Sequence, residues 1–174
     1  MSFMRAIQKM FGRGDSPEEQ QQVIENFKRT RRRNNDLVVA FFDRADWHYD
    51  AVRQKGLDEG QMYVPGGMLL GWLVEKEFVS DEMYELYGEE IDDFLNRNIG
   101  AGYLYQTMDG KLHQDMLTKE GARFMHYYFS AGNYFTDYES TFNARDGAQY
   151  TVTDTWQNYD KLCKLLDLRL RESG

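Results

Sequence analysis

Apolar side chains recur at alternating steps of four and three residues in the last third of the chain, and this spacing constrains the fold more than any other feature. The positions concerned are Phe124, Tyr128, Ala131, Phe135, Tyr138 and Phe142. Steps of three and four return to one face of a helix, so this segment is predicted to be helical with one buried face. Thr118 is suited to cap its start, and Gly132-Asn133 predicts a kink or a break within it.

Two earlier segments show helical patterns of their own. An apolar run from Met68 to about Phe78 follows Pro65-Gly66-Gly67 and is predicted to be the central buried helix, with Trp72 in the core. Ser80 is expected to cap the next helix. The inward stripe of that second helix is predicted to comprise Tyr84, Tyr87, Ile91 and Phe94.

The remaining segments favour little sheet. Leu37–Phe42 is a short apolar run that periodicity cannot assign to a strand or to the start of a helix. Asp43–Asp50 is expected to be a loop and Asp109-Gly110 a turn, while Gln149–Val152 is β-prone but too short to form a sheet alone. A last helix is predicted to start at Asp154. Its apolar face comprises Trp156, Tyr159, Cys163, Leu166 and Leu170, and both Trp72 and Trp156 are expected to be largely buried.

The chain of 174 residues is long enough for one domain with a substantial core. The patterns predict a mainly α fold, a compact single-domain helical bundle with at most one short strand pair. Residues 1–36 are expected to form a basic helical N-terminal extension, and residues 37–174 an acidic helical domain. No apolar run approaches the roughly 20 residues of a membrane span, and no secretory signal is visible, so we expect a cytoplasmic protein.

The charge is unevenly divided along the chain. Residues 1–36 carry a net charge of +3 and contain the basic cluster Lys28–Arg33, whereas residues 37–174 carry a net charge of −11. A basic cluster of this kind can bind phosphate backbones, but it is more typical of a solvated helix end. Because the acidic body would repel nucleic acid, we expect a basic protein partner and no nucleic-acid partner.

Seven carboxylates fall within residues 81–93, a stretch that contains no Lys or Arg. The inward stripe of this predicted helix directs most of them outward. The acidic face is either a solvated surface that keeps the protein soluble or a docking surface for a basic partner, and both interpretations stay open. The residues predicted to contact a partner are Glu85, Glu89, Asp92 and Asp93, together with the aromatic residues Trp47, Tyr127 and Tyr134, whose edges are expected to be exposed.

The sequence contains no Gly-rich phosphate loop, no G-x-S-x-G, no H-E-x-x-H and no C-x-x-C. Its single cysteine, Cys163, lies on an apolar helical face and is predicted to be buried rather than nucleophilic. Asp43, Asp46, His48 and Asp50 are conceivable metal ligands, but nothing pairs them with ligands from a second element. We therefore expect no catalytic residue, no cofactor and no metal.

Several short sequence motifs resemble those of a bacterial family of uncharacterised domains. They occur in order between about Asp43 and Leu168, and they include Trp47-His48-Tyr49, Gly67–Trp72, Asp109–Leu112 and Tyr150–Asp160. That family is similar to the small immunity-type proteins that accompany bacterial polymorphic toxins. The resemblance implies a binding role and no known active site.

The chain is therefore expected to be a protein-binding module, specifically an immunity protein (antitoxin) that neutralises a cognate bacterial toxin domain by direct binding. One alternative is a small-molecule-binding domain or an enzyme that uses the region of Trp47 and His48. A further alternative is a structural component of a larger assembly, with residues 1–36 as its attachment arm. A neighbouring gene for a large toxin with a C-terminal effector domain would favour the first interpretation.

Overall fold

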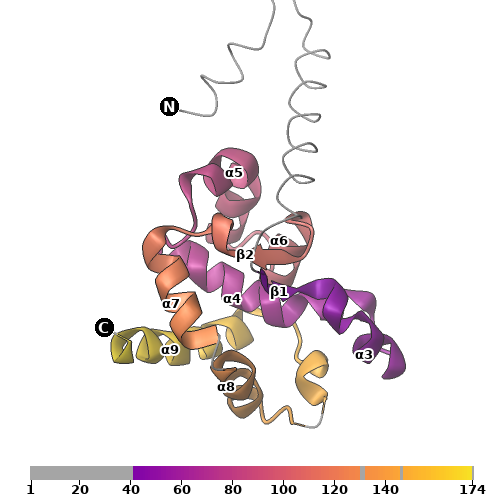
Figure 1. Ribbon diagram of the computed structural model, residues 1–174. Helices are drawn as coiled ribbons and strands as arrows, with labels where there is room; N and C mark the ends of the chain where they lie inside the picture. The colour runs from indigo at the N-terminus through magenta and orange to yellow at the C-terminus, as the bar shows by residue number, and fades with distance from the viewer. Residues whose placement is uncertain (1–40, 130–131, 146, 174) are drawn as a thin grey trace, which may run out of the picture.

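The computed structural model describes residues 41–129, 132–145 and 147–173, and the predicted basic extension of residues 1–36 lies outside these ranges. The described residues are mainly helical and include one two-stranded sheet, as predicted (Figure 1). The short elements are β1 (Phe41–Arg44), η1 (Ala45–His48), η2 (Glu59–Tyr63), β2 (Lys111–His113), η3 (Gln114–Met116) and η4 (Ala148–Thr151). The α-helices are α3 (Tyr49–Gln54), α4 (Val64–Glu75), α5 (Asp81–Leu95), α6 (Ala101–Thr107), α7 (Lys119–Phe129), α8 (Asn133–Phe142) and α9 (Trp156–Glu172).

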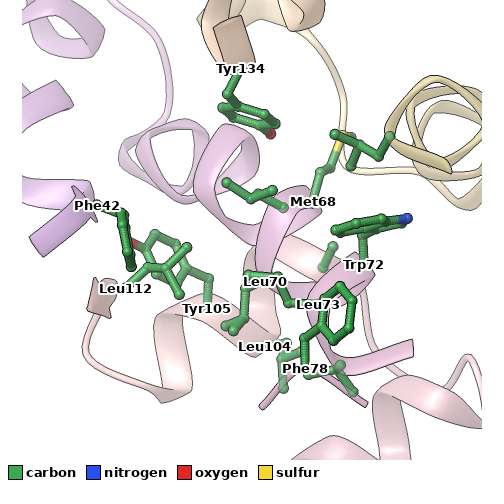
Figure 2. Close-up of a cluster of buried hydrophobic side chains, with 14 of the residues drawn as sticks. Phe42, Met68, Leu70, Trp72, Leu73, Phe78, Leu104, Tyr105, Leu112 and Tyr134 are labelled. Atoms are coloured by element: carbon green, nitrogen blue, oxygen red, sulfur yellow. The ribbon is translucent and has the colours of Figure 1, made fainter. Parts of the chain in front are cut away.

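Helix α4 is the central buried helix that the apolar run predicted. Every residue from Val64 to Val74 is buried, and the other helices lie around it (Figure 1). Trp72 is fully buried in the cluster that Figure 2 shows, and its indole nitrogen donates to Asp167 Oδ1 at 2.9 Å. Helix α6 approaches α4 so closely that a Cβ on Gly67 would lie 2.4 Å from the carbonyl oxygen of Ala101, which is why this position requires glycine.

The periodic segment after Thr118 forms two helices instead of one. The Thr118 hydroxyl accepts the backbone N–H of Gly121 at 3.1 Å, so the predicted cap is confirmed. Gly132 adopts a left-handed conformation, with φ of 70°, and separates α7 from α8. The predicted break is therefore confirmed, and it changes which residues of α8 face the core.

Helices α5 and α9 bury the predicted stripes only in part. In α5, Ile91 and Phe94 are buried, whereas the other two stripe residues, Tyr84 and Tyr87, are partly buried. Ser80 occupies the N-cap position of α5, but its side chain makes no capping hydrogen bond. In α9, Tyr159 and Leu166 are buried, and Trp156, Cys163 and Leu170 pack against the core while remaining partly exposed.

The predicted start of the last helix at Asp154 is wrong by two residues. Helix α9 begins at Trp156, and the Thr155 hydroxyl accepts the backbone N–H of Asn158 at 3.3 Å. The Asp154 carboxylate instead accepts the backbone N–H of Gly102 at 2.8 Å, in the first turn of α6. Asp154 thus caps a helix more than 50 residues away in sequence, a long-range contact that local spacing does not predict.

The strand pair is small. Strand β1 pairs antiparallel with β2, and the predicted turn before β2 is confirmed by positive φ angles at Asp109 and Gly110. The expectation of a loop over Asp43–Asp50 is wrong, because this segment contains the end of β1, η1 and the start of α3. Gln149–Val152 is not extended throughout, since η4 covers its first three residues. Both segments are shaped by tertiary contacts of their polar side chains. No helix in the described ranges is both long and apolar enough to cross a membrane.

Replacing Trp72 by Ala should lower the free energy of unfolding by about 3–5 kcal/mol, because the substitution opens a cavity in a fully buried site and leaves Asp167 without its indole donor. Denaturant unfolding of the purified variant measures this loss. Trp47→Ala is the matched control, since Trp47 is 59% exposed and its removal should change stability by less than about 0.5 kcal/mol. Equal losses for the two variants would contradict the assignment of Trp72 to the core.

Candidate functional site

The most elaborate polar cluster in the described residues is built around a buried carboxylate. Asp43, near the end of β1, is only 2% exposed. Its Oδ2 accepts a hydrogen bond from the hydroxyl of Tyr105 in α6 at 3.1 Å, and its Oδ1 lies 2.8 Å from Nε2 of His48 in η1. A buried carboxylate needs such donors, because its removal from water is otherwise costly.

The second ring nitrogen of His48 is also engaged. His48 Nδ1 lies 2.8 Å from the hydroxyl of Tyr150 in η4, a residue 102 positions away in sequence. The Asp43 carboxylate is an acceptor, so we assign a proton to Nε2, the ring nitrogen that faces it. In the neutral ring Nδ1 then accepts from the hydroxyl of Tyr150. Tyr150, His48 and Asp43 form a chain of donors that ends on one carboxylate, which Tyr105 also reaches.

The start of α4 packs directly against this carboxylate. A Cβ on Gly66 would lie 2.3 Å from Asp43 Oδ2 and 2.4 Å from the ring of Tyr105. Only glycine fits there without displacing the Asp43 carboxylate or the Tyr105 ring. The Asp43 network, defined as Asp43, His48, Tyr105 and Tyr150, therefore joins β1, η1, α6 and η4 beside the first turn of α4.

An aspartate that orients a histidine against a hydroxyl is an arrangement that can move a proton. In this structure both ring nitrogens of His48 are occupied, its side chain is 11% exposed, and Tyr150 is 6% exposed. The group that would react is then the Tyr150 hydroxyl, whose raised pKa opposes ionisation. The residue types are those of an acid–base site, but the geometry is that of a buried hydrogen-bond network that holds the fold together.

Of the four conceivable metal ligands in the segment 43–50, only Asp43 and His48 contact each other. Asp46 accepts from the guanidinium of Arg44, with the Nε contact at 3.0 Å, and Asp50 is exposed. Within the described ranges no three His, Cys, Asp or Glu side chains are grouped as they would be around a metal ion. Burial raises the pKa of Cys163 to about 12, as expected for an unreactive thiol.

The residues predicted to contact a partner lie on several elements. Glu85, Glu89, Asp92 and Asp93 are all exposed on α5. Trp47 in η1 is 59% exposed, and Tyr127 near the end of α7 is 61% exposed.

The expected exposed edge of Tyr134 is wrong. Tyr134 is 1% exposed, and its hydroxyl donates to the carbonyl oxygen of Pro65 in α4. The reason is the left-handed turn at Gly132, which starts α8 in a new phase and directs Tyr134 and Asp137 inward, while Tyr138 stays buried as predicted. A single uninterrupted helix would have placed Tyr134 off the buried stripe.

The two basic residues that flank α5 in sequence are directed to α9. Lys76 pairs with Asp167 at 2.7 Å, and Arg97 pairs with Asp160 at 2.8 Å. The guanidinium of Arg97 also lies 4.5 Å from the ring of Trp156. Both cations therefore form ion pairs with carboxylates of α9.

Replacing Tyr150 by Phe should lower the free energy of unfolding by about 1–3 kcal/mol, because His48 Nδ1 would lose its donor in a site with little water. The control is Tyr49→Phe, which removes a hydroxyl that makes only an exposed 3.4 Å contact with Glu59 and should change stability by less than about 0.5 kcal/mol. Denaturant unfolding compares the two variants. A Tyr150→Phe variant as stable as the wild type would show that the hydrogen bond between Tyr150 and His48 does not contribute to the free energy of unfolding.

Comparison with known proteins identifies one family. Residues 41–152 match the family described as a domain of unknown function (DUF7832). No curated protein and no solved structure matches the chain significantly. The matched range begins at β1 and ends directly after η4, so it contains all four residues of the Asp43 network. The chain belongs to the DUF7832 family.

Proposed function

We propose that this protein is a binding module for a basic protein surface, and specifically an immunity protein that neutralises a cognate bacterial toxin domain in the cytoplasm by covering it. One observation carries the proposal. Helix α5 exposes Glu85, Glu89, Asp92 and Asp93, and residues 81–93 contain no Lys or Arg.

The charge of the body supports a basic partner. Residues 37–174 carry a net charge of −11, and carboxylates that crowd one helix repel one another. A cationic surface placed against α5 relieves this repulsion, and the acidic field accelerates the encounter. Fast association suits a protein that must reach a toxin before the toxin reaches its target.

Exposed aromatic residues supply the apolar part of such an interface. Trp47 and Tyr127 present more than half of their surface to solvent, and Trp and Tyr are enriched among residues that dominate binding energies. Trp47 lies directly between two anchored neighbours, since Asp46 is paired with Arg44 and His48 is held by the Asp43 network. Such anchoring fixes the backbone that presents Trp47, which lowers the entropy lost on binding.

An enzymatic role is the second candidate, and the arrangement of Asp43, His48 and Tyr150 is the observation that favours it. The binding role is preferred because neither ring nitrogen of His48 is available to a substrate and Tyr150 is buried. The neighbouring genes distinguish the two roles. A neighbouring toxin gene with a C-terminal effector domain would support the immunity role. Neighbouring genes for metabolic enzymes would support catalysis.

The test is a fourfold charge reversal on α5, Glu85→Lys, Glu89→Lys, Asp92→Lys and Asp93→Lys, measured against the effector domain of the adjacent toxin gene. We expect association to slow by about tenfold or more and co-expression to stop protecting cells from the toxin. Folding should be little affected, because exposed charges contribute only about 0–1 kcal/mol each.

The matched control reverses four exposed carboxylates on other elements, namely Asp50, Glu59, Asp115 and Glu120. It makes the same change in net charge, so it separates a local contact at α5 from the effect of total charge. Equal slowing in both variants would remove α5 as the contact surface. An effector domain that is acidic would remove the electrostatic argument altogether.

A further inference from the structure

Residues at the end of α7, the start of α8 and the end of α9 line a hollow on a second surface of the protein. Its volume is about 150 Å³, and it is lined by Tyr127, Tyr128, Asn133, Arg169 and Glu172. Pockets for cofactors and drug-sized ligands commonly measure about 300–1,000 Å³. The hollow is therefore too small for a cofactor and of a size for one side chain.

One exposed aromatic residue lines this hollow, and an exposed apolar residue lies on α9 one helical turn before Glu172. Tyr127, on its α7 side, is 61% exposed. Leu168 in α9 is 51% exposed and lies one helical turn before Glu172, on the same face of the helix. Large apolar side chains that remain exposed beside a polar hollow are typical of a surface that binds a partner.

The arginine in the wall of the hollow is already fully engaged. Its Nε and Nη2 donate to the two carboxylate oxygens of Asp137 at 2.7 and 2.9 Å, and its Nη1 donates to Glu172 Oε2 at 2.8 Å. Burial raises the pKa of Asp137, but the hydrogen bonds from Arg169 and Tyr128 outweigh this effect and hold that pKa below its usual value. Asp137 is thus ionised and neutralises Arg169.

The charge balance of the hollow therefore favours a cation. One guanidinium, that of Arg169, faces two carboxylates, those of Asp137 and Glu172. An anionic ligand at Arg169 would be repelled by the carboxylates of Asp137 and Glu172, which already accept from its guanidinium, whereas a cation can approach Glu172 without breaking any bond, because a carboxylate accepts more than one donor. The exposed ring of Tyr127 offers a face to the same cation.

We propose that this hollow is a socket for one cationic side chain of a protein partner, with arginine preferred to lysine. The planar guanidinium would stack on Tyr127 and donate to Glu172. The inference rests on the proposed function in taking the partner to be a basic protein. Its test needs no partner.

The probe is N-acetyl-arginine amide, titrated into the full-length protein while NMR signals of Tyr127, Arg169 and Glu172 are followed. We expect saturable shifts at these residues. N-acetyl-norleucine amide and N-acetyl-glutamate amide should bind more weakly, because the first lacks the cation and the second carries the wrong charge. Equal or tighter binding of either compound would overturn the cationic socket.

Tyr127→Ala should weaken arginine binding about two- to fivefold, the range expected for an exposed cation–π contact. Tyr127→Phe should bind like the wild type, and Tyr103→Ala, which removes another exposed tyrosine in α6, should leave binding unchanged. Glu172→Gln should weaken binding as well. Unchanged affinity in Tyr127→Ala and Glu172→Gln, with both variants folded, would place the probe elsewhere and contradict the proposal.

The fourfold α5 variant distinguishes failure of the socket from failure of the proposed function. The socket predicts that this variant binds the arginine probe as the wild type does, because none of its changes touches α7, α8 or α9. If the probe binds in the hollow but no effector domain associates with the protein, the proposed function fails and the socket stands. If the effector domain binds but the probe does not, the socket fails and the proposed function stands.

Discussion

The buried carboxylate of Asp43 is the interaction on which the arrangement of the chain depends. An ionised carboxylate in the interior costs several kcal/mol unless donors replace its water. Tyr105 and His48 supply those donors, and Tyr150 holds His48 in place from 102 residues away. The DUF7832 match covers residues 41–152, and this network joins Asp43 near its start to Tyr150 near its end.

Helix α9 lies beyond the matched range but completes the structure, and its charges shape both candidate surfaces. Asp160 and Asp167 pair with Arg97 and Lys76, the basic residues that flank α5 in the sequence. Arg169 pairs with Asp137 and so gives the hollow between α7, α8 and α9 an excess of negative charge.

The sequence predicts α4, α5, α7, α8 and α9 because their signal is local, and it does not predict the short helices α3 and α6. Steps of three and four identify α5 and the α7–α8 pair, and the same periodicity places the α5 carboxylates on the exposed side. It does not predict the Asp43 network, whose members lie 62 and 102 residues apart and follow no period. The burial of Tyr134 escapes prediction for a related reason, since the left-handed residue Gly132 shifts the buried face of α8 toward Tyr134 and Asp137.

The most direct test of electrostatic capture is the association rate constant of the wild-type protein with the adjacent effector domain, measured from low to high ionic strength. Attraction between exposed opposite charges is screened over about 8–10 Å at physiological salt, so the account predicts a rate that falls steeply as salt is added. The dissociation rate should change much less. A rate of association that is independent of salt, or that rises with it, would contradict the claim that this protein recognises a basic surface.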